Sequence, residues 1–174
     1  MIRGRNVTLR PVEERDHVLI HAWRTDPRAW RSTDDLVPPS LKDVVEGEER
    51  ARSDGDKPFV IEVEDRPVGR VALEGFRGRD RRCAITTLAP DPDAWTAGHA
   101  RDAIAALVGF AFERNDLHQI EARALATDEG AIAAYEACGF VREATLRDRT
   151  FKDGAWIDHV VMTVRRDSFA ATRA

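Results

Sequence analysis

The chain has 174 residues, of which 43% are hydrophobic and 33% are charged, and its formal net charge is -4. This length suffices for one substantial hydrophobic core and is too short for two typical domains, so we expect a single domain over residues 1–174. The negative balance argues against nucleic acid as the main partner, because surfaces that neutralise phosphates are usually strongly basic.

The first half of the chain predicts a strand, two helices and a hairpin. Alternation over residues 7–9 predicts a strand, and an apolar helical period that ends at Asp26-Pro27 predicts a helix. Ser40-Leu41-Lys42-Asp43 has the spacing of a capping box, which predicts the start of a second helix. Residues 59–63 alternate before a turn at residues 64–67, and residues 68–73 run back after it, as the two arms of a hairpin do.

The second half predicts a further strand after this hairpin, a central helix, another strand, a short helix and two final strands. The central helix buries the stripe of Ile104, Leu107, Val108 and Ala111, and residues 120–125 follow it as a strand. Residues 156–164 are apolar on both sides, as in an interior strand. The expected order is β-α-α-β-β-β-α-β-α-β-β, which is an α/β (α+β) fold with helices on both faces of a mixed sheet.

A small-residue turn, Trp95-Thr96-Ala97-Gly98-His99-Ala100, opens the central helix. Unpaired backbone N–H groups and the positive end of the helix dipole at such a start favour a phosphate or pyrophosphate. Many helices begin this way without a ligand, so the turn alone is a weak signal. Arg101 adds a positive charge at this position.

The second helix start follows about thirty residues later, at Thr127-Asp128, and Gly139 is placed to end that helix in a left-handed conformation. Its face of Ala131, Ala134, Tyr135 and Cys138 points inward because the spacing is i, i+3, i+4, i+7. Tyr135 has two interpretations. It packs in the core with one hydrogen bond, or its phenol donates a proton to a leaving thiolate.

The order of these motifs resembles that of the GNAT acyl-CoA N-acyltransferases, and most closely their Rim-type branch, which includes ribosomal-protein N-terminal acetyltransferases. That family has a pyrophosphate loop of the form Arg/Gln-x-x-Gly-x-Gly/Ala, a strand, and then a segment close to Asn-x-x-x-Ala-x-x-x-Tyr-x-x-x-Gly-Phe. Further similar segments are residues 6–11, 23–27, 68–71 and 151–158. The resemblance implies a mostly antiparallel sheet, acetyl-CoA as acyl donor and a primary amine, such as a peptide N-terminus or a small molecule, as acceptor.

The resemblance also implies the site residues. Cofactor binding falls to Trp95, Gly98, His99, Ala100, Arg101 and Asp128, with the pantetheine arm paired to the backbone of Leu88 and Ala89. Tyr135 is the implied proton donor, and Trp23 and Trp30 are implied contacts of the acceptor, although a tryptophan edge is often simple packing. A homodimer is a habit of this family.

The chain departs from the family pattern at several positions. Thr96 and Ala97 replace a flexible glycine and a basic residue, and Asp128 replaces an asparagine, which adds negative charge near an anionic cofactor. Ala84 stands where many relatives carry a glutamate that accepts the amine's proton, so no general base is visible. These departures keep two rival functions open, a CoA-binding sensor or interaction module with little catalysis and an acyltransferase for a larger group such as succinyl.

Composition also bears on metals, redox state and location. Cys83 and Cys138 lack metal-ligand spacing, so we expect reduced, buried thiols. His17 and His21 share a helix face without a third ligand, so we expect no metal. We find no leader and no apolar run of about eighteen residues, and therefore expect a cytoplasmic protein without membrane contact.

Overall fold

A computed structural model describes residues 1–30, 37–88 and 96–173 of the chain. Eight strands of these residues form one sheet in the order β1-β2-β3-β4-β5-β6-β8-β7, and only the β5–β6 pair is parallel. The strands are β1 (Ile2–Arg3), β2 (Thr8–Pro11), β3 (Lys57–Val63), β4 (Arg66–Arg77), β5 (Arg82–Leu88), β6 (Gln119–Leu125), β7 (Val141–Lys152) and β8 (Ala155–Arg165). The predicted mixed, mostly antiparallel sheet is confirmed.

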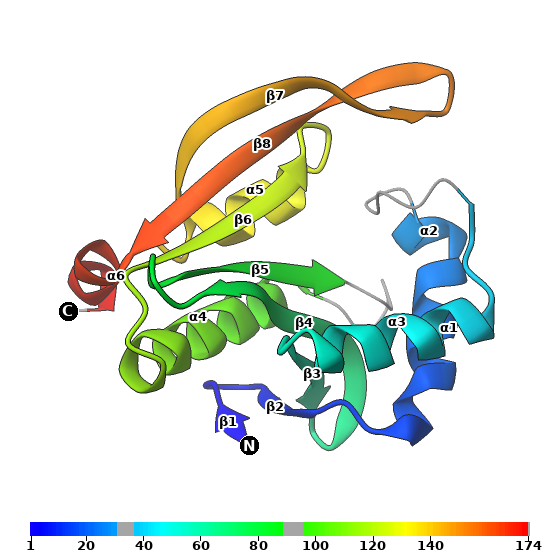
Figure 1. Cartoon of the computed structure of the whole chain (residues 1–174), viewed down its shortest axis with the longest axis horizontal. Coiled ribbons are helices and arrows are strands. Elements are labelled where there is room, and N and C mark those ends of the chain that lie inside the picture. The colour runs from blue at the N-terminus through cyan, green and yellow to red at the C-terminus, as the bar shows by residue number, and fades with distance from the viewer. Residues whose placement is uncertain (31–36, 89–95, 174) are drawn as a thin grey trace.

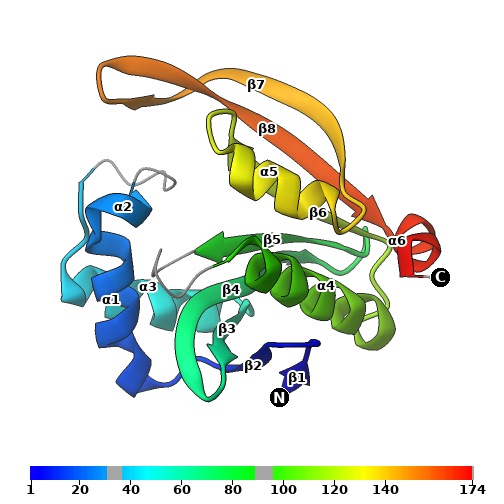
Figure 2. The same cartoon turned by 180° about the vertical axis from the view of Figure 1, so that it is seen from behind.

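Helices cover both faces of this sheet, as predicted. They are α1 (His17–Thr25), α2 (Pro27–Trp30), α3 (Leu41–Ser53), α4 (Ala97–Arg114), α5 (Glu129–Glu136) and α6 (Arg166–Arg173), with a 3-10 turn at Glu14–Asp16. Figure 1 shows α3 in front of the sheet over β3 and β4 with α1 beside it. Figure 2, from behind, shows α4 and α5 in front.

Two apolar clusters hold these layers together, and strand alternation assigns residues to them. On β3, Val60 points to a smaller cluster under α1 and α3, whereas its neighbour Ile61 points to the main core under α4. The predicted stripe of α4 is in that main core, where Ile104 and Leu107 are fully buried. The smaller cluster consists of Val12, Ile20, Trp23, Val44 and Val60.

Local sequence signals set the helix boundaries. Ser40 Oγ accepts the Asp43 N–H at 3.2 Å and Asp43 Oδ2 accepts the Ser40 N–H at 2.8 Å, which is the predicted capping box. Asp128 Oδ1 accepts the Ala131 N–H at 2.9 Å and begins α5. Gly139 follows this helix with φ of +87°, the left-handed conformation that favours glycine.

The expectation of an interior strand over residues 156–164 is confirmed from His159 onward, where β8 lies between β6 and β7, and is wrong for residues 156–158. β8 pairs with β6 only from His159 to Arg165, so its first residues extend beyond the sheet and pair with β7 alone. Trp156 is 61% exposed and its ring lies 5.2 Å from that of Phe151, which is 50% exposed. Apolar residues here mark a projecting hairpin tip rather than an interior strand, and Figure 1 shows this arm reaching past β6.

The structure also contains elements that the sequence analysis did not predict, namely β1, α2 and α6. α6 continues β8 without a loop, and Phe169 packs its ring 5.7 Å from Phe112 of α4. None of the described helices is long and apolar enough to cross a bilayer.

Candidate active site

The parallel pair β5 and β6 diverges partway along its length. The two strands pair from Arg82 with Gln119 to Ile85 with Ala122, after which β5 continues beside β4 and β6 beside β8. Figure 1 shows the two arrows starting together and separating toward their ends. In the described part of the chain, the facing edges of β5 beyond Ile85 and of β6 beyond Ala122 therefore have no strand partner. An unpaired strand edge presents backbone N–H and C=O groups, which can form hydrogen bonds with the amide groups of an extended ligand.

Leu88 is the last residue of β5 and lies on this open edge, paired with Arg70 of β4 on its other side. The resemblance implies that this backbone pairs with the pantetheine arm, and that role stays a prediction. The neighbouring predicted residue, Ala89, lies outside the described residues, as does Trp95.

The N-terminus of α4 follows, and Thr96 caps it. Thr96 accepts the His99 N–H through its carbonyl at 3.0 Å and its hydroxyl at 3.3 Å, and the Ala100 N–H through its carbonyl at 3.2 Å. Among the described residues, no acceptor is found for the N–H of exposed Gly98. The first turn of α4 carries no acidic residue, and Arg101 is exposed directly after it, so the local charge suits an anion.

A contact between α5 and α4 brings the two predicted motifs together. Cys138 Sγ donates to the Arg101 carbonyl at 3.3 Å, which holds the end of α5 against the start of α4. Tyr135 lies one turn before Cys138 on the same buried face, with 2% of its surface exposed and its ring 5.1 Å from that of Phe140. The phenol of Tyr135 thus belongs to the helix that packs beside the first turn of α4.

Both cysteines are buried and reduced, as predicted. Burial raises the pKa of the Cys83 thiol to about 12. Burial also raises the pKa of Cys138 to about 11, with a smaller opposing effect from the charge of Arg101. Thiols with these pKa values are not nucleophiles at neutral pH, so neither cysteine is suited to form an acyl-enzyme.

Carboxylates lie on both sides of Ala84 on the face of the sheet that carries α3. The register pairs Ala84 with Glu74 of β4 and with Glu121 of β6, and paired residues have side chains on the same face. Thr86 Oγ1 donates to Glu74 Oε1 at 2.8 Å. Glu74 and Thr86 could not be identified from the sequence, because alternation gives the face of a residue but not its neighbour on the next strand.

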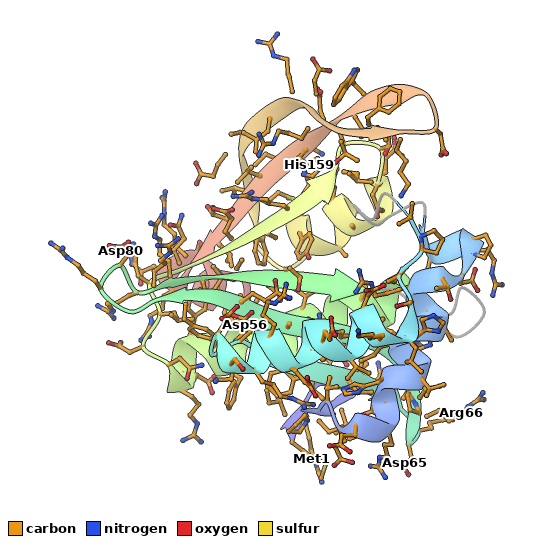
Figure 3. The ribbon with its side chains drawn as sticks, turned by 45° about the vertical axis from the view of Figure 1, so that its right-hand side comes forward. Met1, Asp56, Asp65, Arg66, Asp80 and His159 are labelled. Atoms are coloured by element: carbon orange, nitrogen blue, oxygen red, sulfur yellow. The ribbon has the colours of Figure 1, made fainter. Side chains whose placement is uncertain are left out.

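Arg70 and Glu48 extend this polar group toward α3. Arg70 Nε lies 2.7 Å from Glu48 Oε1, in an ion pair whose angle is not that of a hydrogen bond, and Arg70 Nη2 donates to Glu48 Oε2 at 3.3 Å. Arg70 Nη1 lies 3.8 Å from Glu74 Oε1. Figure 3 shows α3 crossing this face below β5, with β6 and β8 beyond it.

His159 is a titratable side chain on β8, opposite Leu125 at the end of β6. It is 9% exposed, its Nε2 lies 2.8 Å from Thr150 Oγ1, and Figure 3 labels it at the base of the projecting hairpin. The preceding residue, Asp158, is bonded to a different partner: its Oδ1 accepts the Asp148 N–H at 2.9 Å. Among the described residues, no three His, Cys, Asp or Glu side chains gather as a metal ion would require.

The two predicted acceptor contacts lie at the end of α1 and in α2. Trp23 is 8% exposed and packs in the smaller apolar cluster with Ile20 and Val44. The backbone of Trp30 ends α2, and its side chain lies outside the described residues. The role of both residues in acceptor binding stays a prediction.

Comparisons with known proteins assign this arrangement to a family. The profile of the acetyltransferase (GNAT) domain matches residues 6–141. A probable N-acetyltransferase, YjcK of Bacillus subtilis (strain 168), is 26% identical over 174 residues that cover 94% of this chain and 96% of the relative.

Solved structures with the same fold include two that were determined with CoA or a CoA derivative. The spermidine N-acetyltransferase of Vibrio cholerae, in complex with CoA and spermine, has a TM-score of 0.86 at 23% identity, with 95% of this chain and 98% of that chain covered. Mycobacterium smegmatis RimJ, in complex with CoA-disulfide, has a TM-score of 0.80 at 22% identity, with 92% of this chain and 82% of that chain covered.

Proposed function

This chain belongs to the GNAT acetyltransferase family, and from that premise we propose how its residues transfer an acetyl group from acetyl-CoA to a primary amine. The observation that carries the proposal is the divergence of β5 and β6 next to an acid-free helix N-terminus. The open strand edge suits the amide-containing arm of the donor, and the helix start suits its pyrophosphate.

Donor binding is assigned to backbone groups and one cation. The Gly98 N–H and the charge of Arg101 bind the pyrophosphate, with His99 and Ala100 in the same turn, and the backbone of Leu88 pairs with the pantetheine arm. Among the described residues, a Cβ at Gly98 would meet only Thr96 Oγ1, at 3.5 Å, so we expect a larger residue there to occupy the approach of the phosphates. Asp128 caps α5 and adds a negative charge beside the anion.

Transfer proceeds by direct attack. The amine nitrogen forms a bond to the thioester carbon, the carbon–sulfur bond breaks, and the Tyr135 hydroxyl gives its proton to the departing sulfur. A covalent acyl-enzyme is not part of this route, since the pKa values of the two cysteines are raised to about 11 and about 12.

The proposed acceptor is a primary amine. Fold alone does not fix the substrate, so a peptide N-terminus and a small-molecule amine are both retained as candidates. Fold likeness to RimJ supports the Rim-type branch, and fold likeness to the spermidine enzyme equally supports a polyamine acceptor. Trp23 and Trp30 are the proposed walls on the acceptor side.

The proposal is tested by measuring thiol release from acetyl-CoA with spermine and with a short peptide that has a free N-terminus. We expect release with a primary amine and a product heavier by one acetyl group. CoA binding without thiol release from any acceptor would favour the rival binding module, and faster release from succinyl-CoA would favour the larger acyl group.

Donor binding has its own test in Gly98→Asp, which should weaken CoA binding at least about tenfold in calorimetry. Gly98→Asn adds the bulk without the charge. Gly47→Asp is the matched control, because Gly47 is exposed on α3 with no described atom within 4 Å of its Cβ, and it adds the same charge on the face of the sheet opposite α4. Unchanged affinity in Gly98→Asp would mean that the phosphates bind elsewhere.

A further inference from the structure

The family's proton acceptor is missing at Ala84, but the structure provides two carboxylates as its direct neighbours in the sheet. Glu74 of β4 and Glu121 of β6 both pair with Ala84 in register, and all three side chains share the face opposite α4. The two glutamates differ in what binds them.

The carboxylate of Glu121 is paired with a positively charged side chain. Its Oε1 accepts from Arg123 Nε at 2.8 Å, two residues further along β6. Glu74 accepts from the neutral hydroxyl of Thr86 at 2.8 Å, while Arg70 lies 3.8 Å away and is bound more closely, at 2.7 Å, by Glu48. With 33% of its side chain exposed, Glu74 can also exchange protons with solvent.

The contact with Thr86 places the Glu74 carboxylate at the divergence of the strands. Pairing of β5 with β6 ends at Ile85, so Thr86 is the first residue of β5 on the open edge. Thr86 lies two residues beyond Ala84 toward Leu88, a rise of roughly 7 Å along a strand. The carboxylate is therefore displaced from the family position toward Leu88, whose backbone the proposed function pairs with the pantetheine arm of the donor.

We propose that Glu74, acting through the Thr86 hydroxyl, accepts the proton of the amine; the inference rests on the proposed function. The ammonium group gives a proton to Thr86 Oγ1 as the Thr86 proton passes to Glu74 Oε1, which leaves a neutral amine and a neutral Glu74. The amine then attacks, Tyr135 gives its proton to the departing sulfur, and the second amine proton, released as the amide forms, returns to the Tyr135 oxygen. Glu74 returns its proton to solvent.

The charged groups around this pair come from three elements and one loop. Arg70 lies on the same strand as Glu74, Glu48 comes from α3, and Glu121 lies across Ala84 on β6. Asp56, just before β3, accepts the backbone N–H of Gly75 at 2.9 Å. Because these neighbours keep their charge in Glu74→Gln and in Thr86→Val, a change in activity in those two variants reports on Glu74 and Thr86.

Glu74→Gln is the main test, since its amide oxygen still accepts from Thr86 but is a far weaker base. We expect kcat to fall about 100-fold at neutral pH, with KM for acetyl-CoA and the melting temperature unchanged. The deficit should shrink as pH approaches the pKa of the amine, because a neutral amine needs no proton acceptor. Thr86→Val should show the same pH-dependent deficit, and Glu121→Gln, the matched control, should retain the activity of the unmodified protein.

A rescue separates a chemical role from a structural one. Ala84→Glu in the Glu74→Gln background restores a carboxylate at the family position and should recover at least about tenfold of the lost kcat. Glu74→Gln with full activity at neutral pH, or with an equal loss at every pH and no rescue, would overturn this inference and leave the proposed function standing. An unmodified protein that binds CoA but acetylates no amine would refute both.

Discussion

Asp102 of α4 holds the N-terminal turn of the chain by accepting hydrogen bonds from three backbone N–H groups. Its Oδ1 accepts the Arg5 N–H at 2.9 Å, and its Oδ2 accepts the N–H groups of Asn6 at 2.6 Å and Val7 at 3.1 Å. Hydrogen bonds to a charged group contribute about 1.5–3 kcal/mol each when buried, and about 1 kcal/mol is appropriate for these more exposed ones. Asp102→Ala should therefore lower the free energy of unfolding by about 3 kcal/mol.

Gly4 provides an independent check of the same contact. A Cβ at Gly4 would lie 2.7 Å from Asp102 Oδ2 and 2.8 Å from its Cγ, which is closer than such atoms approach. Gly4→Ala should cost about 1–3 kcal/mol through this overlap, and the cost should shrink in the Asp102→Ala background because the carboxylate is gone.

Urea unfolding of the two single variants and the double variant measures this coupling. A loss of less than about 0.5 kcal/mol in the free energy of unfolding for Asp102→Ala, or full additivity of the two changes, would refute the role of the Asp102 carboxylate in holding residues 5–7.

The remaining predictions concern acid stability, thiol reactivity and charge near the donor. Burial alone would raise the pKa of Asp16, but the Arg10 guanidinium and a backbone N–H hold it below its usual value, so its stabilisation is full above about pH 3.9 and lost as pH falls through the lower folded-state pKa. Asp16→Asn should remove that part of the acid sensitivity in pH titrations followed by circular dichroism, and an unchanged slope would contradict this. With their pKa values raised to about 12 and about 11, Cys83 and Cys138 should resist iodoacetamide at neutral pH until the chain is unfolded in urea; rapid alkylation of the folded protein would show that they are accessible. Asp128→Asn should keep the helix cap and bind CoA equally or more tightly, most clearly at low salt, whereas weaker binding would mean that the carboxylate has a specific partner.

Local signals in the sequence predicted much of the fold. The capping box at Ser40, the cap at Asp128 and the inward face of Tyr135 each depend on spacing within one helix, and all three occur as predicted. They are readable because their partners are only a few residues away in the chain.

Features that depend on register or on distant segments were not predictable. The pairing of Ala84 with Glu74 follows from how far β4 slides past β5, and β4 has a register shift between Glu74 and Arg77 that no local pattern encodes. The hydrogen bond from the Asn6 N–H to the Asp102 carboxylate joins residues 96 positions apart. The exposed position of Trp156 follows from the length of its strand relative to β6, which composition does not show.

The central claim, direct transfer with Tyr135 as proton donor, is tested most directly by the rate of thiol release in Tyr135→Phe. The ring and its packing against Phe140 are kept, so CoA affinity should stay within a few-fold and stability should fall by no more than about 1 kcal/mol. Turnover with a primary amine should fall about 100-fold or more. A stable Phe variant that releases thiol at the rate of the unmodified protein would contradict the account and remove Tyr135 from the chemistry.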